Sequence, residues 1–309
     1  MSRSPSSPVA GVLLCIVSAC SHSAPEKPAR LHGPPVTPDI VAARGERQFE
    51  YHQRQVLLIE NLVKESGLPP TAAANLLDDV RRAGHPTPPV VRPADFVTHL
   101  KDWVAAADGK DSAQQAAVYL IADRALRAVW QPLALNDTDQ AESVGAVTRL
   151  NAMGVQTSLS GGGDMVYPGN WLQTVAALDP KGPMGQRAEL LLLEIDCGAS
   201  PSNYHSIVQR LETILANPAD SEVQFTAQVL EADAYGDVVA LAHGYGRENA
   251  DSTQFAPEAD DARTKAITLY EAALAIDHTS RLARGGQLAH DRLASGQRVD
   301  HTRFFCFGE

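Results

Sequence analysis

Positive charge is in short supply in this chain of 309 residues. Lysine and arginine total 26, against 37 aspartates and glutamates, so the formal net charge at pH 7 is −11. A nucleic-acid-binding surface, or a polybasic surface for anionic lipids, needs clustered positive charge. The sequence therefore argues against nucleic acid as a partner.

Aromatic residues are also scarce, at 6% of the chain, and long β-branched runs are missing. Strands favour both kinds of residue, whereas the abundant alanine favours helices. The hydrophobic share of 44% is enough for a packed core. After residue 20, no stretch reaches the roughly 20 apolar residues that a membrane-spanning helix requires. We therefore expect an all-α protein without a later membrane span.

The first 19 residues have the form of an export signal. A short apolar stretch, too short to span a membrane, leads into Val17-Ser18-Ala19-Cys20. This ending resembles the lipobox of bacterial lipoproteins. The resemblance implies that residues 1–19 are removed and that Cys20 is acylated, which would hold the protein on a membrane. The alternative is an ordinary signal peptide with an unrelated cysteine.

The residues after Cys20 bear on location. Residues 20–38 are rich in proline, which predicts a tether between membrane and folded body. Ser21, rather than aspartate, follows the cysteine. By the same resemblance, this predicts a lipid-anchored protein of the bacterial cell envelope, on the outer membrane and facing the periplasm.

A helical N-terminal region is expected over residues 39–153. Apolar residues recur at helical spacing there, and no window alternates as a strand does. A capping box, Ser112-x-x-Gln115, predicts one helix start. The expected helices run from residue 38 to a stop at Gly67, over 71–82, through Phe96–Val104, from Ser112 onward, and over 139–153.

A short sequence pattern recurs within residues 154–309. Three apolar helix ends close alike, with Asp179-Pro180, Asn217-Pro218 and Asp277-His278. A second capping box, Ser221-x-x-Gln224, follows the middle one.

The three helix ends resemble the end of the second helix of a tetratricopeptide (TPR) repeat. Ahead of the last one, Ala266, Tyr270 and Ala273 keep that helix's small–aromatic–small spacing. The resemblance implies an array of α-helical hairpins, a degenerate TPR-like solenoid, in this half of the chain. The alternative is an unrelated α-helical bundle.

Two cysteines remain beyond Cys20. In an oxidising compartment, Cys197 and Cys306 are candidates for a disulfide that ties down the C-terminal tail. Two buried free thiols are the alternative. No histidine or cysteine spacing favours a metal site, and no motif predicts a cofactor.

No catalytic motif is present either. The glycine-rich loop at residues 160–169 lacks the lysine and hydroxyl residue of a phosphate-binding loop. Tyr167, Trp171 and Tyr235 are candidate partner contacts, with packing between helices as the alternative.

The sequence thus predicts a lipid-anchored scaffold or accessory subunit for protein–protein interaction, and no enzyme. The alternatives are an envelope enzyme, or a small-ligand-binding lipoprotein, with a site assembled from distant helices.

Overall fold

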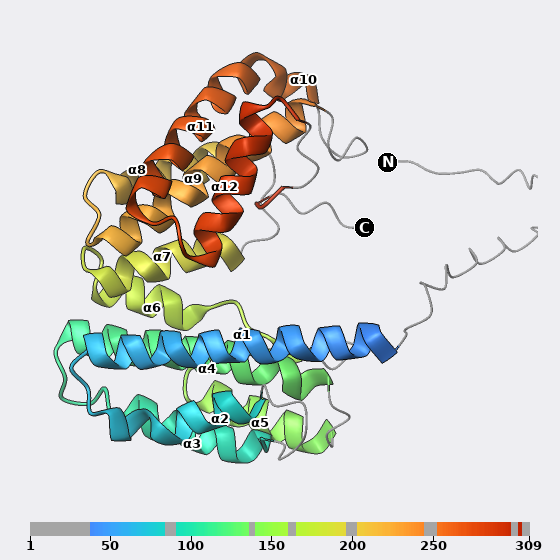
Figure 1. Cartoon of the computed structure of the whole chain (residues 1–309). Helices are drawn as coiled ribbons and strands as arrows, with labels where there is room; N and C mark the ends of the chain where they lie inside the picture. Colours follow the sequence, from blue (N-terminus) through green and yellow to red (C-terminus); the bar gives the residue numbers. More distant parts are fainter. Residues whose placement is uncertain are drawn as a thin grey trace, which may run out of the picture. The chain divides into compact units, whose positions relative to one another are not determined.

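The computed structural model describes residues 38–83, 91–135, 140–159, 165–195, 203–243, 252–297 and 302–304. Residues 42–309 form one compact unit. The protein is an all-α helical array, as expected (Figure 1). The helices of its first part are α1 (Pro38–Glu65), a 3₁₀ turn η1 (Pro70–Ala73), α2 (Ala74–Ala83), α3 (Pro93–Ala105), α4 (Ser112–Leu135) and α5 (Gln140–Ala152).

The second part begins with two short strands and continues as helices. The strands β1 (Ser158–Leu159) and β2 (Met165–Val166) pair antiparallel. The strand β1 directly precedes the glycine-rich loop at residues 160–169, and β2 lies within that loop. No strand was expected here, because two residues in each strand are too few to leave an alternating pattern. The helices are α6 (Asn170–Leu178), α7 (Pro183–Ile195), α8 (Tyr204–Leu215), α9 (Ser221–Ala242), α10 (Ser252–Phe255), η3 (Ala256–Glu258), α11 (Ala259–Ile276) and α12 (Arg281–Ala294).

Buried apolar residues form two clusters within this unit. One extends from α1 to α7, and the other from α7 to α12 and Phe304. In the first, the Trp103 indole N–H donates to the Val118 carbonyl at 2.9 Å and joins α3 to α4. Similarly, His52 Nε2 lies 2.9 Å from the Ala128 carbonyl oxygen and links α1 to α4.

Both helix starts that the capping boxes predicted are capped one residue earlier than expected. The Asp111 carboxylate accepts from the Gln114 N–H at 2.8 Å, and the Asp220 carboxylate accepts from the Val223 N–H at 2.8 Å. Aspartate caps a helix as well as serine does, and its charge also favours the positive helix N-terminus. The serines that follow, Ser112 and Ser221, are therefore the first helical residues.

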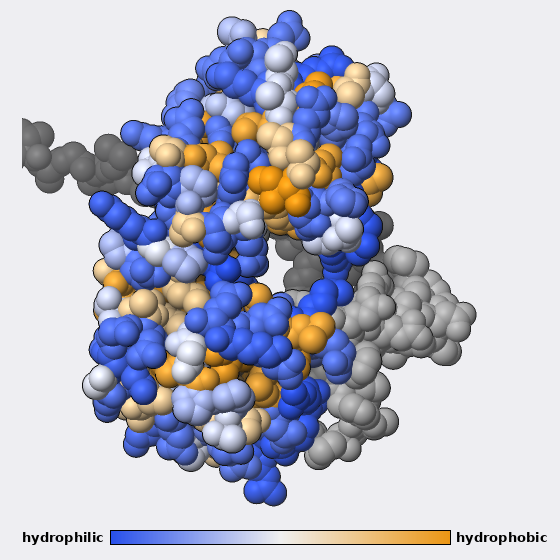
Figure 2. Space-filling view, turned by 60° about the vertical axis from the view of Figure 1, so that its left-hand side comes forward, coloured by the Kyte–Doolittle hydropathy of each residue, from blue (hydrophilic) through white to orange (hydrophobic). Residues whose placement is uncertain are grey.

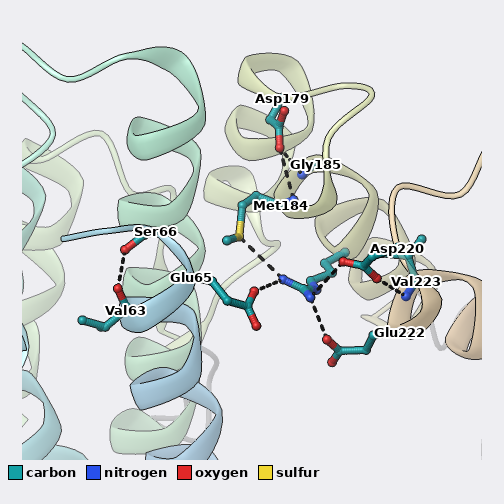
Figure 3. Close-up of polar contacts among 10 residues, drawn as sticks. Val63, Glu65, Ser66, Asp179, Met184, Gly185, Asp220, Glu222 and Val223 are labelled. Atoms are coloured by element: carbon teal, nitrogen blue, oxygen red, sulfur yellow. Dashed lines mark hydrogen bonds and ion pairs between the residues drawn. The ribbon is translucent and has the colours of Figure 1, made fainter. Parts of the chain in front are cut away.

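The three similar helix ends share a position in the fold, and those at Asp179 and Asp277 also share a local physical cause. Each lies in the short turn of an antiparallel helix pair: α6 and α7, α8 and α9, or α11 and α12. Asp179 accepts from the Met184 N–H at 3.2 Å (Figure 3), and Asp277 accepts from the Thr279 N–H at 2.8 Å. An aspartate at the turn thus satisfies backbone donors at the start of the next segment.

Arg187 on α7 connects three separate segments. Its guanidinium lies 2.5 Å from Glu65 at the end of α1, 3.1 Å from Asp220 and 2.7 Å from Glu222 at the start of α9. Figure 3 shows the three carboxylates directed at the same guanidinium. Since the arginine side chain is only 14% exposed, these ion pairs are screened less than surface pairs. They tie the end of α1 to the start of α9.

The face in Figure 2 is mostly hydrophilic, with hydrophobic residues in patches between hydrophilic ones. Among the described residues, the large apolar side chains that stand exposed are Leu57, Val144, Val166, Ile276 and Leu288. No described helix combines the length and the apolar character needed to cross a bilayer.

Candidate functional site

A cavity of about 440 Å³ lies among α9, α11, α12 and the segment Thr302–Arg303; we call it the α12 cavity. Small residues on α12, Gly285, Gly286 and Ala289, form one wall. A Cβ at Gly286 would lie 3.4 Å from the Tyr270 ring, an ordinary contact distance, so α12 passes close to α11 at this point. The volume lies within the range of small-ligand sites in proteins.

Asp237 lies in the C-terminal part of the buried helix α9. Its side chain binds the backbone of Arg303 and Phe304. Its carboxylate accepts from the Arg303 N–H at 2.9 Å and from the Phe304 N–H at 2.8 Å. The Phe304 side chain is 1% exposed and belongs to the second core cluster. This short stretch of chain is therefore held by backbone hydrogen bonds and by one aromatic anchor.

Asp233, one helical turn before Asp237, pairs with two side chains of the cavity. It accepts from the Tyr270 hydroxyl at 2.5 Å, and it forms an ion pair with Arg303 at 2.5 Å. Burial and the Asp233 charge raise the pKa of Tyr270, so this hydroxyl stays a donor. Asp233 and Asp237 are thus engaged in holding α11 and the segment Thr302–Phe304.

Burial raises the pKa of Asp237 to about 7, although the N–H groups of Phe304 and Arg303 favour its ionised form. The folded protein therefore retains a proton that the unfolded chain releases near pH 4. The stabilisation from this proton is lost as pH rises from about 4 through 7.

The Asp237→Asn substitution should remove this pH dependence. We expect the variant to be less stable than the wild type at pH 5, and its deficit to shrink by more than 1 kcal/mol by pH 8, since wild-type Asp237 loses its proton over that range. Urea unfolding at each pH measures the difference. Asp102→Asn, at an exposed site on α3, is the charge-matched control. A deficit for Asp237→Asn that is constant with pH would contradict the expectation.

The candidate partner contacts fall in two places. Tyr235 lines a second cavity, among α8, α9 and α11. Tyr167 and Trp171 are buried, and their rings meet edge to face at 6.4 Å. The Arg127 guanidinium lies 4.7 Å from the centre of the Tyr167 ring, and Tyr119 on α4 neighbours Trp171. These two aromatic residues therefore pack α6 and the strand β2 against α4, which is the alternative the sequence left open.

The candidate lipidation site, Cys20, and the candidate disulfide cysteines, Cys197 and Cys306, lie outside the described residues. The described part of the chain contains no group of three histidine, cysteine, aspartate or glutamate residues that could hold a metal ion.

Sequence reasoning missed Asp233 and Asp237. A signal was present, because both stand at helical spacing in Val229–Ala242, a stretch that is apolar or small apart from these two acids and Glu231, and acids are rarely buried in such a stretch without partners. Their partner, Arg303, is 66 or more positions away, and spacing alone does not reveal it.

Similarity to known proteins does not assign a function to this chain. No protein-family model matches the chain, and neither a curated protein nor a solved structure does so.

Proposed function

We propose that this chain is a lipid-anchored cell-envelope protein that binds a partner protein through its C-terminal helices. The supporting observation is the way α9, α11 and α12 hold the segment Thr302–Phe304. A buried carboxylate receives its backbone N–H groups, and a core position receives its aromatic side chain. A bound peptide would be held by the same two kinds of contact, hydrogen bonds to its backbone and an apolar side chain in a pocket.

The α12 cavity lies directly beside this segment and is the place for a partner to enter. Its walls combine apolar side chains, such as Leu282 and Leu293, with the charged Arg292. A mixed lining of this kind suits a peptide or loop that brings both an apolar anchor and a polar group. The recurrent Asp-containing turns favour a TPR-like array as the scaffold for this cavity.

Membrane attachment is the second part of the proposal. Cys20 would carry the acyl chains, and residues 21–38 would form the tether that lets the helices reach a partner. The proposed site is the outer membrane of a bacterial envelope, on its periplasmic face.

Copurification from detergent-solubilised membranes tests the binding role. We expect one protein to be recovered with this chain in a fixed molar ratio. Gly285→Leu should lower that recovery at least fivefold, because no described atom lies within 4 Å of a side chain at Gly285 and the leucine would occupy the cavity. Gly145→Leu on α5, another helical glycine in open space, is the matched control. A monomer without partner, active on an envelope substrate, would overturn the proposal.

The Cys20→Ala substitution tests the anchor. We expect a precursor that keeps residues 1–19 and incorporates no labelled fatty acid, since the acyl chains attach to the cysteine thiol. Metabolic labelling and intact-mass measurement report both properties. Normal labelling of the variant would refute the assignment of Cys20.

A further inference from the structure

A second cavity, of about 250 Å³, lies among α8, α9, η3 and α11, apart from the α12 cavity; we call it the Tyr235 cavity. Two tyrosines, Tyr204 and Tyr235, form its aromatic side, with their rings edge to face at 6.1 Å. Three carboxylates also line it, from Glu212 on α8, Glu258 at η3 and Asp261 on α11. Aromatic faces and carboxylates together are the surroundings that an organic cation prefers.

One cation of the chain already uses this chemistry. The Lys265 ammonium lies 2.9 Å from Asp261 and 5.2 Å from the centre of the Tyr235 ring. It neutralises only one of the carboxylates that line the cavity. Among the described residues, Glu212 and Glu258 have no ion-pair partner, although both are exposed and within reach of a ligand.

A further carboxyl group lies buried next to the cavity. Glu231 is 5% exposed. Burial raises its pKa to about 7, and Glu212 adds to the rise while Lys265 opposes it. Because burial disfavours the ionised form of Glu231, a cation bound nearby would favour its ionisation.

We propose that the Tyr235 cavity binds an alkyl ammonium group. The ammonium would lie against the tyrosine rings and between Glu212 and Glu258, beside Lys265. Within the described residues, no three ligands converge as a divalent metal would require, and the aromatic lining favours an organic cation over a bare ion. An alkyl ammonium group can come from a lysine side chain of a protein or from a free diamine. Only binding of a protein lysine rests on the proposed partner-binding role.

Calorimetric titration of the full-length chain in neutral detergent tests this proposal. The probes are 1,5-diaminopentane and Nα-acetyl-lysine methylamide, with 1,5-pentanediol as an uncharged probe of similar length. We expect both amines to bind and the diol to show no binding. Tighter binding of the lysine amide would identify a protein lysine as the source, and tighter binding of the diamine would identify a free amine.

Two substitutions make the test specific. Glu212→Gln and Glu258→Gln should each weaken amine binding about fivefold, as expected for loss of one partly exposed charge pair. Glu271→Gln, on α11 but outside the cavity, removes the same charge and should leave the affinity unchanged. Equal weakening by all three substitutions, or no binding of either amine, would overturn the proposal. Because partner recovery is measured separately, a failure of this site is distinguishable from a failure of the binding role.

Discussion

Gly185→Ala should lower the free energy of unfolding by about 3 kcal/mol or more. Gly185 lies in the first turn of α7, and an alanine methyl group there would overlap the backbone carbonyl of Asp179, which follows the end of α6. Figure 3 shows Asp179 and Gly185 next to each other in this turn. The carbonyl cannot move aside easily, because it accepts from the Gly182 N–H at 3.1 Å while the Asp179 side chain caps Met184. Urea unfolding, followed by circular dichroism, measures the loss.

Gly285→Ala is the matched control for this prediction. Gly285 also lies in a helix, but no described atom lies within 4 Å of a side chain placed there. Alanine has the higher helix propensity, so we expect stability to be unchanged or to rise by up to about 1 kcal/mol. Opposite signs for the two substitutions would assign the cost at Gly185 to close packing of the turn. Equal effects would contradict this interpretation.

Phe304→Ala should cost about 3 kcal/mol, the lower end of the range for a buried aromatic residue. The side chain is almost fully buried among residues of α9 to α12, although it lies only five positions from the end of the chain. Its loss should also free the Arg303 segment from Asp237, because one anchor of that segment is then missing. We expect protease cleavage near residue 303 to become at least tenfold faster. Thermal unfolding and limited proteolysis measure the two effects.

Phe304→Leu tests whether the cost of Phe304→Ala comes from the lost apolar side chain. A leucine keeps an apolar side chain in the same space, so its cost should stay below about 1.5 kcal/mol. An alanine variant as stable as the wild type would mean that the segment contributes nothing to the fold. It would also remove the main support for peptide binding by these helices.

The helices of this protein were largely predictable from local sequence. The expected helix at 139–153 is observed as Gln140–Ala152, and the stop expected at Gly67 follows α1 directly. Gly67 has a φ of 66°, which glycine adopts without the strain that a side chain would bring. Helical periodicity and turn residues act over a few positions, so they can be read without knowledge of the fold.

The helix starts were placed less exactly. The sequence offers both an aspartate and a serine before α4 and before α9, and either can cap a helix. The aspartate is the capping residue in both cases. The capping residue is the one that keeps an extended backbone, as Asp220 does. Which of the two residues does so depends on the path of the turn before the helix.

The two cavities depended on residues that are distant in sequence. The α12 cavity needs Asp233 and Asp237 beside Arg303, and the Tyr235 cavity needs Glu212 beside Glu258. All three candidate aromatic residues are buried; Tyr235 lines a cavity, whereas Tyr167 and Trp171 pack against each other. An aromatic residue at helical spacing fits the core and a partner surface equally well, so the pattern does not separate the two uses.

The all-α character, the positions of most helices and the recurrent turns of this protein follow from its amino-acid order, because propensity, capping and apolar spacing are properties of neighbouring residues. The tertiary structure decided which acids are buried, which aromatic residues remain available to a ligand and where the C-terminal segment lies. These depend on how α9 is enclosed by α8, α11 and α12, and burial of this kind is a property of the packed helices together.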